Sequence, residues 1–177
     1  MEGYFSFPTK VWRSHHEGTI RKIGPGRKFY RVISAVSLIH SLLQAMSHFN
    51  PHFTFTAPDE LKMPQEYKDF LDSKGIPYRE TKELEGNINE CDILYMTRVQ
   101  QERFTDPMEY EKVKNTYNLT ASMLGQAKPN MKILHPLPRV TEIAQDVDDT
   151  PHAYYFKQAE NGVYVRMAII AYLLGYK

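Results

Sequence analysis

The sequence predicts an α/β protein with a doubly wound, mostly parallel sheet that helices cover on both faces. Two observations carry this prediction. From about residue 53 onward, short apolar runs alternate with helical patterns, and strand–helix–strand order of this kind is typical of parallel sheets with right-handed crossovers. The runs at 92–97 and 131–134 are apolar without alternation, as strands buried on both faces require.

The first half of the chain contains two helical patterns and two strand patterns. Residues 34–49 are expected to form a helix, because their apolar side chains share one side. The run HFTFTA at 52–57 predicts a strand, and a helix at 64–73 follows it. That helix has a proline at its first position and Gly75 after its last turn. Residues 76–81 form a second, weaker strand pattern.

The second half has the clearest strand and the clearest helix start. The run DILYMT at 92–97 predicts a buried strand, and Asp106 is a good N-cap with Glu109 at capping-box spacing. The run MKIL at 131–134 predicts a further strand. A closing helix is expected at 162–174, with four apolar residues on one face: Val163, Met167, Ile170 and Leu174. These elements together predict a three-layer, Rossmann-like architecture.

Length and composition indicate one cytoplasmic domain. The 177 residues suit a single domain, which we place at 31–177, and residues 1–30 lack periodicity and are expected to be irregular. The single Cys91 suits a reducing compartment. We see no signal peptide, and the longest apolar stretch, at 167–174, is too short to cross a membrane. We therefore expect no membrane partner.

Positive charge gathers in the first 50 residues. A basic stretch of this kind can bind nucleic acid or a membrane surface. It contains no repeat and no motif of a nucleic-acid-binding module, so a solvated segment is the favoured interpretation. We expect no nucleic-acid partner.

Polar residues follow the two buried strands. Arg98 and Gln100 come directly after 92–97, and ligands of open parallel sheets bind outside the carboxyl ends of the strands. The planar guanidinium of Arg98 suits a carboxylate or a phosphate. Gln100 can pair with an amide, a carboxylate or an ammonium group. A lone arginine at a strand end is, however, more often a partner in a surface ion pair.

A proline-stiffened turn, His135-Pro136-Leu137-Pro138, follows the strand at 131–134, and Arg139 comes after it. The prolines lack N–H groups and fix the backbone, so carbonyl oxygens remain as acceptors. Carbonyls beside arginines would suit an amino acid that meets an acyl phosphate. His135 could equally be a capping or core histidine, and Arg166 could tie the last helix to the sheet. Residues alone therefore predict an α/β domain that binds a small anion.

Several motifs together are more specific. They include IHSLLQAM at 39–46, APDELKMPQ at 57–65, DILYMTRVQQER at 92–103 and the long run from MKILHPLPR to YVR at 131–166. Over residues 38–175 the chain resembles the C-terminal half of aspartate carbamoyltransferase catalytic chains, within the aspartate/ornithine carbamoyltransferase family. Ornithine enzymes are expected to carry a cysteine where Pro136 stands, so the aspartate branch is favoured.

The resemblance implies a role for each site residue. Arg98 would bind the side-chain carboxylate of L-aspartate and Gln100 its amino-acid end, while Pro136 and Leu137 would offer backbone carbonyls to the carbamoyl group and the attacking amine. His135, Arg139 and Arg166 would support the site. The implied reaction transfers the carbamoyl group of carbamoyl phosphate to aspartate in pyrimidine biosynthesis. It needs no metal or organic cofactor, and homotrimers are the implied assembly.

The chain also departs from the family pattern. The carbamoyl-phosphate domain is expected to be absent, and Ser37 stands where an aspartate-binding arginine is expected; Thr141 and Met167 replace an acidic residue and a glutamine. A catalytically inactive amino-acid-binding or interaction domain that retains the fold is therefore the alternative function. A nucleotide-binding domain is disfavoured, because Gly24-Pro25-Gly26 has no third glycine.

Overall fold

The computed structural model describes residues 30–32, 37–49, 51–99, 106–114 and 117–176. Within these residues, five strands form one parallel sheet in the order β3-β2-β1-β4-β5. The strands are β1 (Tyr30–Val32), β2 (Phe53–Thr56), β3 (Tyr78–Thr81), β4 (Ile93–Tyr95) and β5 (Lys132–Leu134). Because the order reverses at β1, the sheet is doubly wound. The predicted fold class is confirmed.

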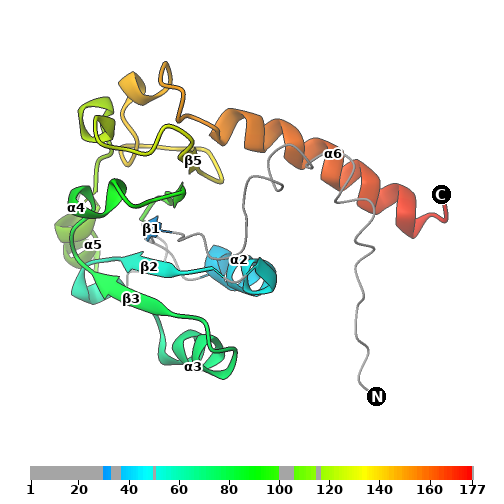
Figure 1. The fold of residues 1–177 in the computed structure, drawn as a ribbon, viewed down its shortest axis with the longest axis horizontal. Coiled ribbons are helices and arrows are strands. Elements are labelled where there is room, and N and C mark those ends of the chain that lie inside the picture. The colour runs from blue at the N-terminus through cyan, green and yellow to red at the C-terminus, as the bar shows by residue number, and fades with distance from the viewer. Residues whose placement is uncertain (1–29, 33–36, 50, 100–105, 115–116, 177) are drawn as a thin grey trace.

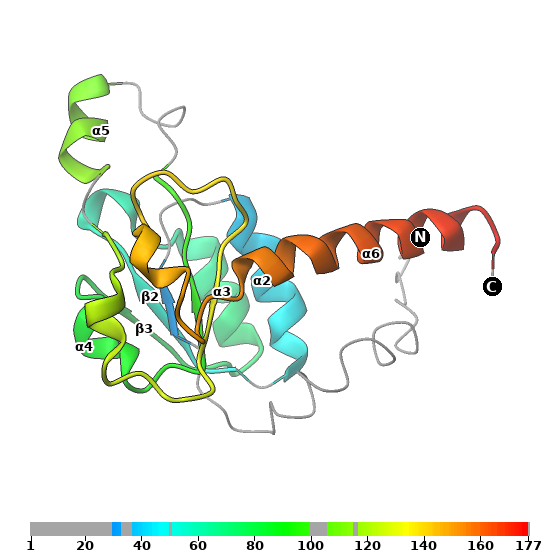
Figure 2. The same cartoon turned by 90° about the horizontal axis from the view of Figure 1, so that it is seen from above.

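Helices and 3-10 turns connect the strands (Figure 1). They are α2 (Ser37–Met46), η1 (Ser47–Phe49), η2 (Asp59–Leu61), α3 (Gln65–Ser73), α4 (Glu85–Ile88), α5 (Pro107–Val113), η4 (Ala121–Leu124), η5 (Gln145–Val147) and α6 (Tyr155–Leu173). Helices α2 and α3 lie on one side of the strands and α4 on the other (Figure 2). The three-layer arrangement follows from these positions.

Two apolar clusters fill the two sides of the sheet. One joins α2 and α3 to β2, and its buried members are Leu43, Phe53, Phe55, Met63, Leu71 and Ile76. The other joins α4 and η4 to β4, β5 and the start of α6, and it includes Ile88, Leu94, Leu124, Ile133 and Tyr155. The buried apolar members of the runs at 92–97 and 131–134 that join a cluster, among them Leu94, Met96 and Ile133, all belong to the second one.

Local signals in the sequence placed several elements well. Asp106 is the N-cap of α5, and its side chain accepts a hydrogen bond from the N–H of Met108 at 2.8 Å. Gly75 follows α3 with a φ of 64°, a left-handed conformation that costs glycine little. Pro64 lies at the N-cap of α3, one residue earlier than expected. The side chain of Glu109 and residues 34–36 lie outside what the structure describes.

β1 begins at Tyr30, which pairs with Leu94, and residues 1–29 lie outside the described part of the chain. One helix boundary differs from the prediction. Helix α6 begins at Tyr155 instead of residue 162. Tyr155 is fully buried, so the first turn of α6 is held by core packing that a helical pattern in the sequence does not reveal.

Helix α6 extends beyond the sheet in both views (Figures 1 and 2). Its apolar side chains are exposed: Val163 by 52%, Met167 by 59%, Ile170 by 58% and Leu174, just past its end, by 70%. The predicted apolar face thus exists, but the described residues do not bury it. Monomeric proteins rarely leave so many large apolar residues together in solvent, and patches of this kind mark interaction surfaces.

Candidate active site at the carboxyl ends of two central strands

The segments that follow β4 and β5 leave the sheet side by side. Tyr95 pairs with Leu134 at the end of the two strands. The pairing continues one residue further, because the N–H of Met96 donates to the carbonyl of Leu134 at 2.8 Å. Arg98 and the turn that starts at His135 therefore emerge at the same edge of the sheet. This edge is where open parallel sheets bind ligands.

Arg98 is exposed, whereas Thr97 before it is buried. The strand and Thr97 thus anchor the backbone of Arg98 while its guanidinium can meet a solute. Gln100, the second residue predicted on this segment, lies outside the described residues. The structure therefore places Arg98 at the sheet edge and leaves the position of Gln100 open.

The turn at 135–138 has an unusual backbone. Leu137 has a φ of 55°, and the Leu137–Pro138 peptide bond is cis. A left-handed conformation is uncommon for a residue other than glycine and costs free energy of order 1–3 kcal/mol. Such a conformation persists only where the surroundings determine it. Pro136 and Leu137 are partly exposed.

His135 contacts the backbone of the turn through its buried side chain. It is 1% exposed, and its Nδ1 lies 2.8 Å from the backbone nitrogen of Leu137 while its Nε2 lies 2.7 Å from Oε1 of Glu142. Its own N–H donates to Oε1 of Gln158 in α6 at 2.9 Å. His135 is therefore a core histidine and at the same time a direct contact of the candidate site.

Glu142 is buried, with 6% of its surface exposed. Its Oε2 accepts the N–H groups of Val140 at 3.1 Å and Thr141 at 3.0 Å. Burial opposes ionisation of this carboxyl, but the hydrogen bonds from His135 and from backbone N–H groups outweigh burial and lower the pKa of Glu142. Glu142 is therefore a buried carboxylate whose two oxygens accept hydrogen bonds from three donors.

Arg139 is engaged by a neighbouring acid. Its guanidinium forms a two-pronged pair with Asp148, with Nη2 at 2.5 Å from Oδ2, and it donates to the hydroxyl of Tyr155 at 3.2 Å. The Tyr155 hydroxyl in turn donates to Asp148. The hydrogen bond from Arg139 lowers the pKa of Asp148. Arg139 therefore links the loop at 139–148 to the first turn of α6.

Arg166 lies further along α6 and is exposed. Its Nη1 is close to the backbone of Gly162, because a Cβ at that glycine would lie 3.5 Å away. The side chain thus belongs to the solvent-facing surface of the helix. The supporting role expected of Arg166 therefore stays a prediction, and the burial of α6 near the sheet belongs to Tyr155 in its first turn.

Sequence reasoning missed Glu142, Asp148 and Gln158. Glu142 and Asp148 are acids within ten residues of the turn, and the sequence does not show that Glu142 is buried or that Asp148 pairs with Arg139. Gln158 was overlooked because the helix was expected to begin at 162, four residues later. An acid close after the proline turn could have suggested Glu142 as a site residue. Its contact with His135 could not be predicted from the spacing of the two residues.

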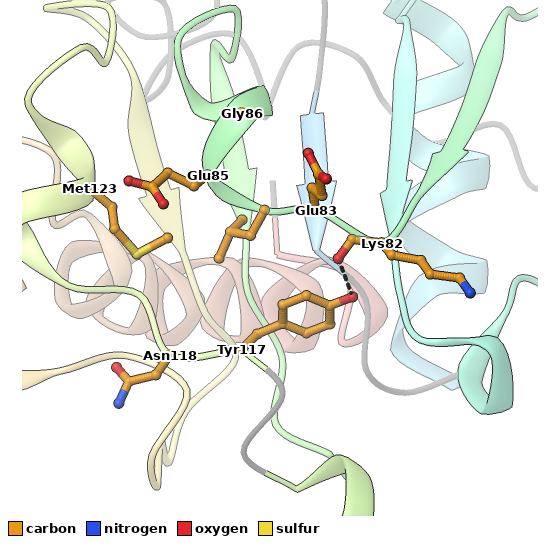
Figure 3. A pocket seen from close by; sticks show the side chains of 8 residues that line it. Lys82, Glu83, Glu85, Gly86, Tyr117, Asn118 and Met123 are labelled. Atoms are coloured by element: carbon orange, nitrogen blue, oxygen red, sulfur yellow. Dashed lines mark hydrogen bonds between the residues drawn. The ribbon is translucent and has the colours of Figure 1, made fainter.

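A separate pocket of about 550 Å³ opens between α4 and the segment after α5 (Figure 3). The hydroxyl of Tyr117 donates to the carbonyl of Lys82 at 2.9 Å across it, and burial raises the pKa of Tyr117 to about 12. The lining residues are Lys82, Glu83, Leu84, Glu85, Gly86, Tyr117, Asn118 and Met123. The predicted site residues that the structure describes do not line this pocket.

Within the described part of the chain, no group of three or more His, Cys, Asp or Glu side chains is placed to hold a metal ion. Among the same residues, no helix combines the length and the apolar character that crossing a membrane would need.

Comparison with known proteins gives one consistent family. Residues 31–173 match the family profile described as aspartate/ornithine carbamoyltransferase, Asp/Orn binding domain. The aspartate carbamoyltransferase catalytic subunit of Bacteroides fragilis is 61% identical over 138 residues, which cover 77% of this chain and 45% of that protein. The corresponding subunit of Methanosarcina mazei is 49% identical over 162 residues, covering 92% and 50%.

Solved structures agree with these relatives. The catalytic subunit of M. jannaschii aspartate transcarbamoylase superposes with a TM-score of 0.79 at 39% identity, covering 92% of this chain and 54% of that one. The Trypanosoma cruzi enzyme in complex with carbamoyl phosphate and aspartate gives 0.77 at 28% identity, covering 88% and 52%. This chain thus spans about half the length of the curated relatives it matches.

Proposed function

This chain belongs to the aspartate/ornithine carbamoyltransferase family, and from that membership we propose that it is the aspartate-binding half of an aspartate carbamoyltransferase catalytic subunit. In the proposed reaction the amine of L-aspartate attacks the carbonyl carbon of carbamoyl phosphate. A C–N bond forms, the bond to the phosphate oxygen breaks, the amine loses a proton and phosphate leaves. N-carbamoyl-L-aspartate, a pyrimidine precursor, is the product.

The observation that carries the proposal is the pairing of β4 with β5. It brings Arg98 and the turn at 135–138 to one edge of the sheet. A guanidinium there can bind the side-chain carboxylate of aspartate, and Gln100 is proposed to bind its amino-acid end. The carbonyls of Pro136 and Leu137 can accept hydrogen bonds from the carbamoyl group and the attacking amine. Catalysis would rest on positioning and fixed charge.

Aspartate is favoured over ornithine as the amino acid. The relatives with the identities reported above carry the aspartate name, and Pro136 stands where a cysteine is expected in ornithine enzymes. An arginine at the sheet edge also suits a dicarboxylic amino acid better than a cationic one, because a guanidinium repels an ammonium group.

The binding site for carbamoyl phosphate is proposed to come from protein outside residues 31–177. The exposed face of α6, formed by Val163, Met167, Ile170 and Leu174, is the proposed contact surface for that second half. Full burial of each such side chain stabilises by roughly 1.5–3 kcal/mol, so the four together can hold a domain in place. Assembly into homotrimers in the cytoplasm completes the proposal.

One observation favours a second candidate, a catalytically inactive amino-acid-binding domain. Ser37 opens α2, at the position where an aspartate-binding arginine is expected. The loss of one charge-assisted hydrogen bond costs roughly 1.5–3 kcal/mol, which weakens binding about 10- to 150-fold. Weak binding of amino acids without turnover, even beside a complete second half, would identify this alternative.

Calorimetry and reconstitution test the proposal together. The chain is titrated with succinate and L-aspartate, with and without carbamoyl phosphate, and turnover is then assayed alone and after addition of the N-terminal half of the Bacteroides fragilis subunit. We expect dicarboxylate binding, turnover near zero for the chain alone, and carbamoyl-aspartate formation in the mixture. Binding of nucleotides in place of dicarboxylates would overturn the proposal.

A further inference from the structure

The orientation of the His135 ring follows from its two contacts. The backbone nitrogen of Leu137 can only donate a hydrogen bond, so Nδ1 of His135, 2.8 Å away, must be an acceptor without a proton. The single ring proton of the neutral imidazole is then on Nε2. From there it is donated to Oε1 of Glu142 at 2.7 Å. Glu142 thereby selects one of the two tautomers.

Glu142 is held as the ionised carboxylate, which is the form that accepts the proton of His135 Nε2. Oε2 of Glu142 accepts two backbone N–H groups, from Val140 and Thr141, and a protonated carboxyl would have to give up one of its acceptor sites. The chain of donors therefore runs in one direction, from Leu137 N–H to His135 and from His135 to Glu142. This chain of donors begins at Leu137, the residue with the left-handed backbone.

We propose that His135 is a positioning residue that aims the backbone of the 135–138 turn at the substrate through the tautomer that Glu142 imposes. In this role it touches no substrate. It fixes the N–H of Leu137 and thereby the direction of the Pro136 and Leu137 carbonyls, while Gln158 fixes the His135 backbone from α6 at 2.9 Å. The functional part of this inference rests on the proposed binding of aspartate at the same turn; the tautomer does not.

The molecule contains its own control. His152 is also buried, and its Nδ1 lies 3.1 Å from the carbonyl of Met131. A carbonyl can only accept, so Nδ1 of His152 carries a proton. The two buried histidines are thus expected to differ at Nδ1, which is protonated in His152 and unprotonated in His135. Nitrogen-15 NMR of the full chain, with long-range ring correlations, distinguishes the two patterns directly. The same state of Nδ1 in both rings, or a proton on Nδ1 of His135, would overturn the proposal.

Two substitutions then separate positioning from packing. In His135→Asn the amide oxygen lies where Nδ1 was and can still accept the Leu137 N–H, but the contact with Glu142 is lost. In His135→Gln the longer amide reaches Glu142, but the acceptor for Leu137 is lost. We expect hydrogen exchange at the Leu137 amide to be about tenfold faster in His135→Gln than in His135→Asn. We also expect His135→Gln to bind succinate about fivefold to tenfold more weakly than His135→Asn.

Equal effects of the two variants on Leu137 exchange would show that His135 only fills space, and would overturn the positioning role. Melting temperatures of both variants are measured in parallel, because a general loss of packing lowers both alike. If the wild-type chain binds no succinate while the two rings differ at Nδ1 and the exchange rates differ, the proposed function fails and the positioning of the turn stands. If the exchange rates match while succinate binding is intact, the positioning role fails and the proposed function stands.

Discussion

Tyr95 lies opposite Leu134 at the end of two parallel strands. This register decides the candidate site, because the chain leaves β4 and β5 at the same level and carries Arg98 and His135 to one edge. A shift by one residue would turn every side chain of one strand to the other face of the sheet. It would also move Thr97 or His135 out of its buried position.

Removal of the Arg98 guanidinium is expected to abolish most of the affinity for dicarboxylates. Arg98→Ala should weaken succinate binding at least about tenfold, because a charge-assisted contact is lost, while the melting temperature stays within about 2 °C since the side chain is exposed. Calorimetry measures the affinity. Lys157→Ala is the matched control, as Lys157 is exposed and pairs only with Glu160 among the ion pairs of the described residues. Equal losses in both variants would contradict a specific role for Arg98.

Restoring an arginine at residue 37 should increase affinity. Ser37→Arg introduces the group that the family pattern expects at the start of α2, and a gain of roughly 1.5–3 kcal/mol corresponds to about 10- to 150-fold tighter binding. Ser47→Arg is the control, because Ser47 follows the other end of α2 and is the first residue of η1. No gain in succinate affinity from Ser37→Arg would mean that this position does not face the amino acid in this chain.

Removal of the Glu142 carboxylate is expected to lower the free energy of unfolding strongly. Glu142→Ala leaves the buried Nε2–H of His135 and two backbone N–H groups without their acceptor, so the free energy of unfolding should fall by about 3–5 kcal/mol. Glu142→Gln should cost less, because its amide keeps one acceptor oxygen. Urea unfolding at pH 7 measures both. A loss below about 1 kcal/mol for the alanine variant would show that water replaces the carboxylate.

The same carboxylates set the response to acid. The pKa values of Glu142 and Asp148 are lower in the folded chain than their ordinary values of 4.5 and 3.8. A lowered pKa contributes stability that is present above the unfolded value and is lost as pH falls through the folded one. Unfolding midpoints in urea should therefore fall as pH drops below about 4.5. The double variant Glu142→Gln, Asp148→Asn should show a flatter pH dependence, and an unchanged slope would contradict the assignment.

The exposed face of α6 should be needed for assembly and not for binding. Replacement of Val163, Met167 and Ile170 by serine is expected to prevent reconstitution with the N-terminal half of a relative, because their apolar surface is then lost from the contact. Succinate binding should persist within about twofold, since the site lies at the sheet edge. Size-exclusion chromatography with light scattering measures the complex. A reconstituted complex with the triple variant would place the contact elsewhere.

Much of this fold is readable from local chemistry. The non-alternating runs at 92–97 and 131–134 became the paired strands β4 and β5, and Asp106 caps α5 as its spacing indicates. Each of these signals depends on neighbours in sequence. The start of α6 depends instead on Tyr155, whose burial comes from packing against a distant strand.

The candidate site divides in the same way. Arg98 and the prolines of the turn were recognisable because residue type and position after a strand predict their chemistry. The residues that support them were not, because Glu142 and Gln158 contact His135 at sequence separations of seven and 23 residues. A surface acid and a buried one have the same letter in the sequence. Only the folded chain shows that His135, which allowed two interpretations, contacts both the core and the turn.

The most direct test of the central claim is a titration of the nitrogen-15-labelled chain with succinate, followed by NMR at three amides. We predict that the amides of Arg98 and Leu137 shift together and give one dissociation constant, while the amide of Tyr117 in the separate pocket stays unchanged (Figure 3). Shifts at Tyr117 with none at Arg98 and Leu137, or different dissociation constants for Arg98 and Leu137, would contradict a shared site at the ends of β4 and β5.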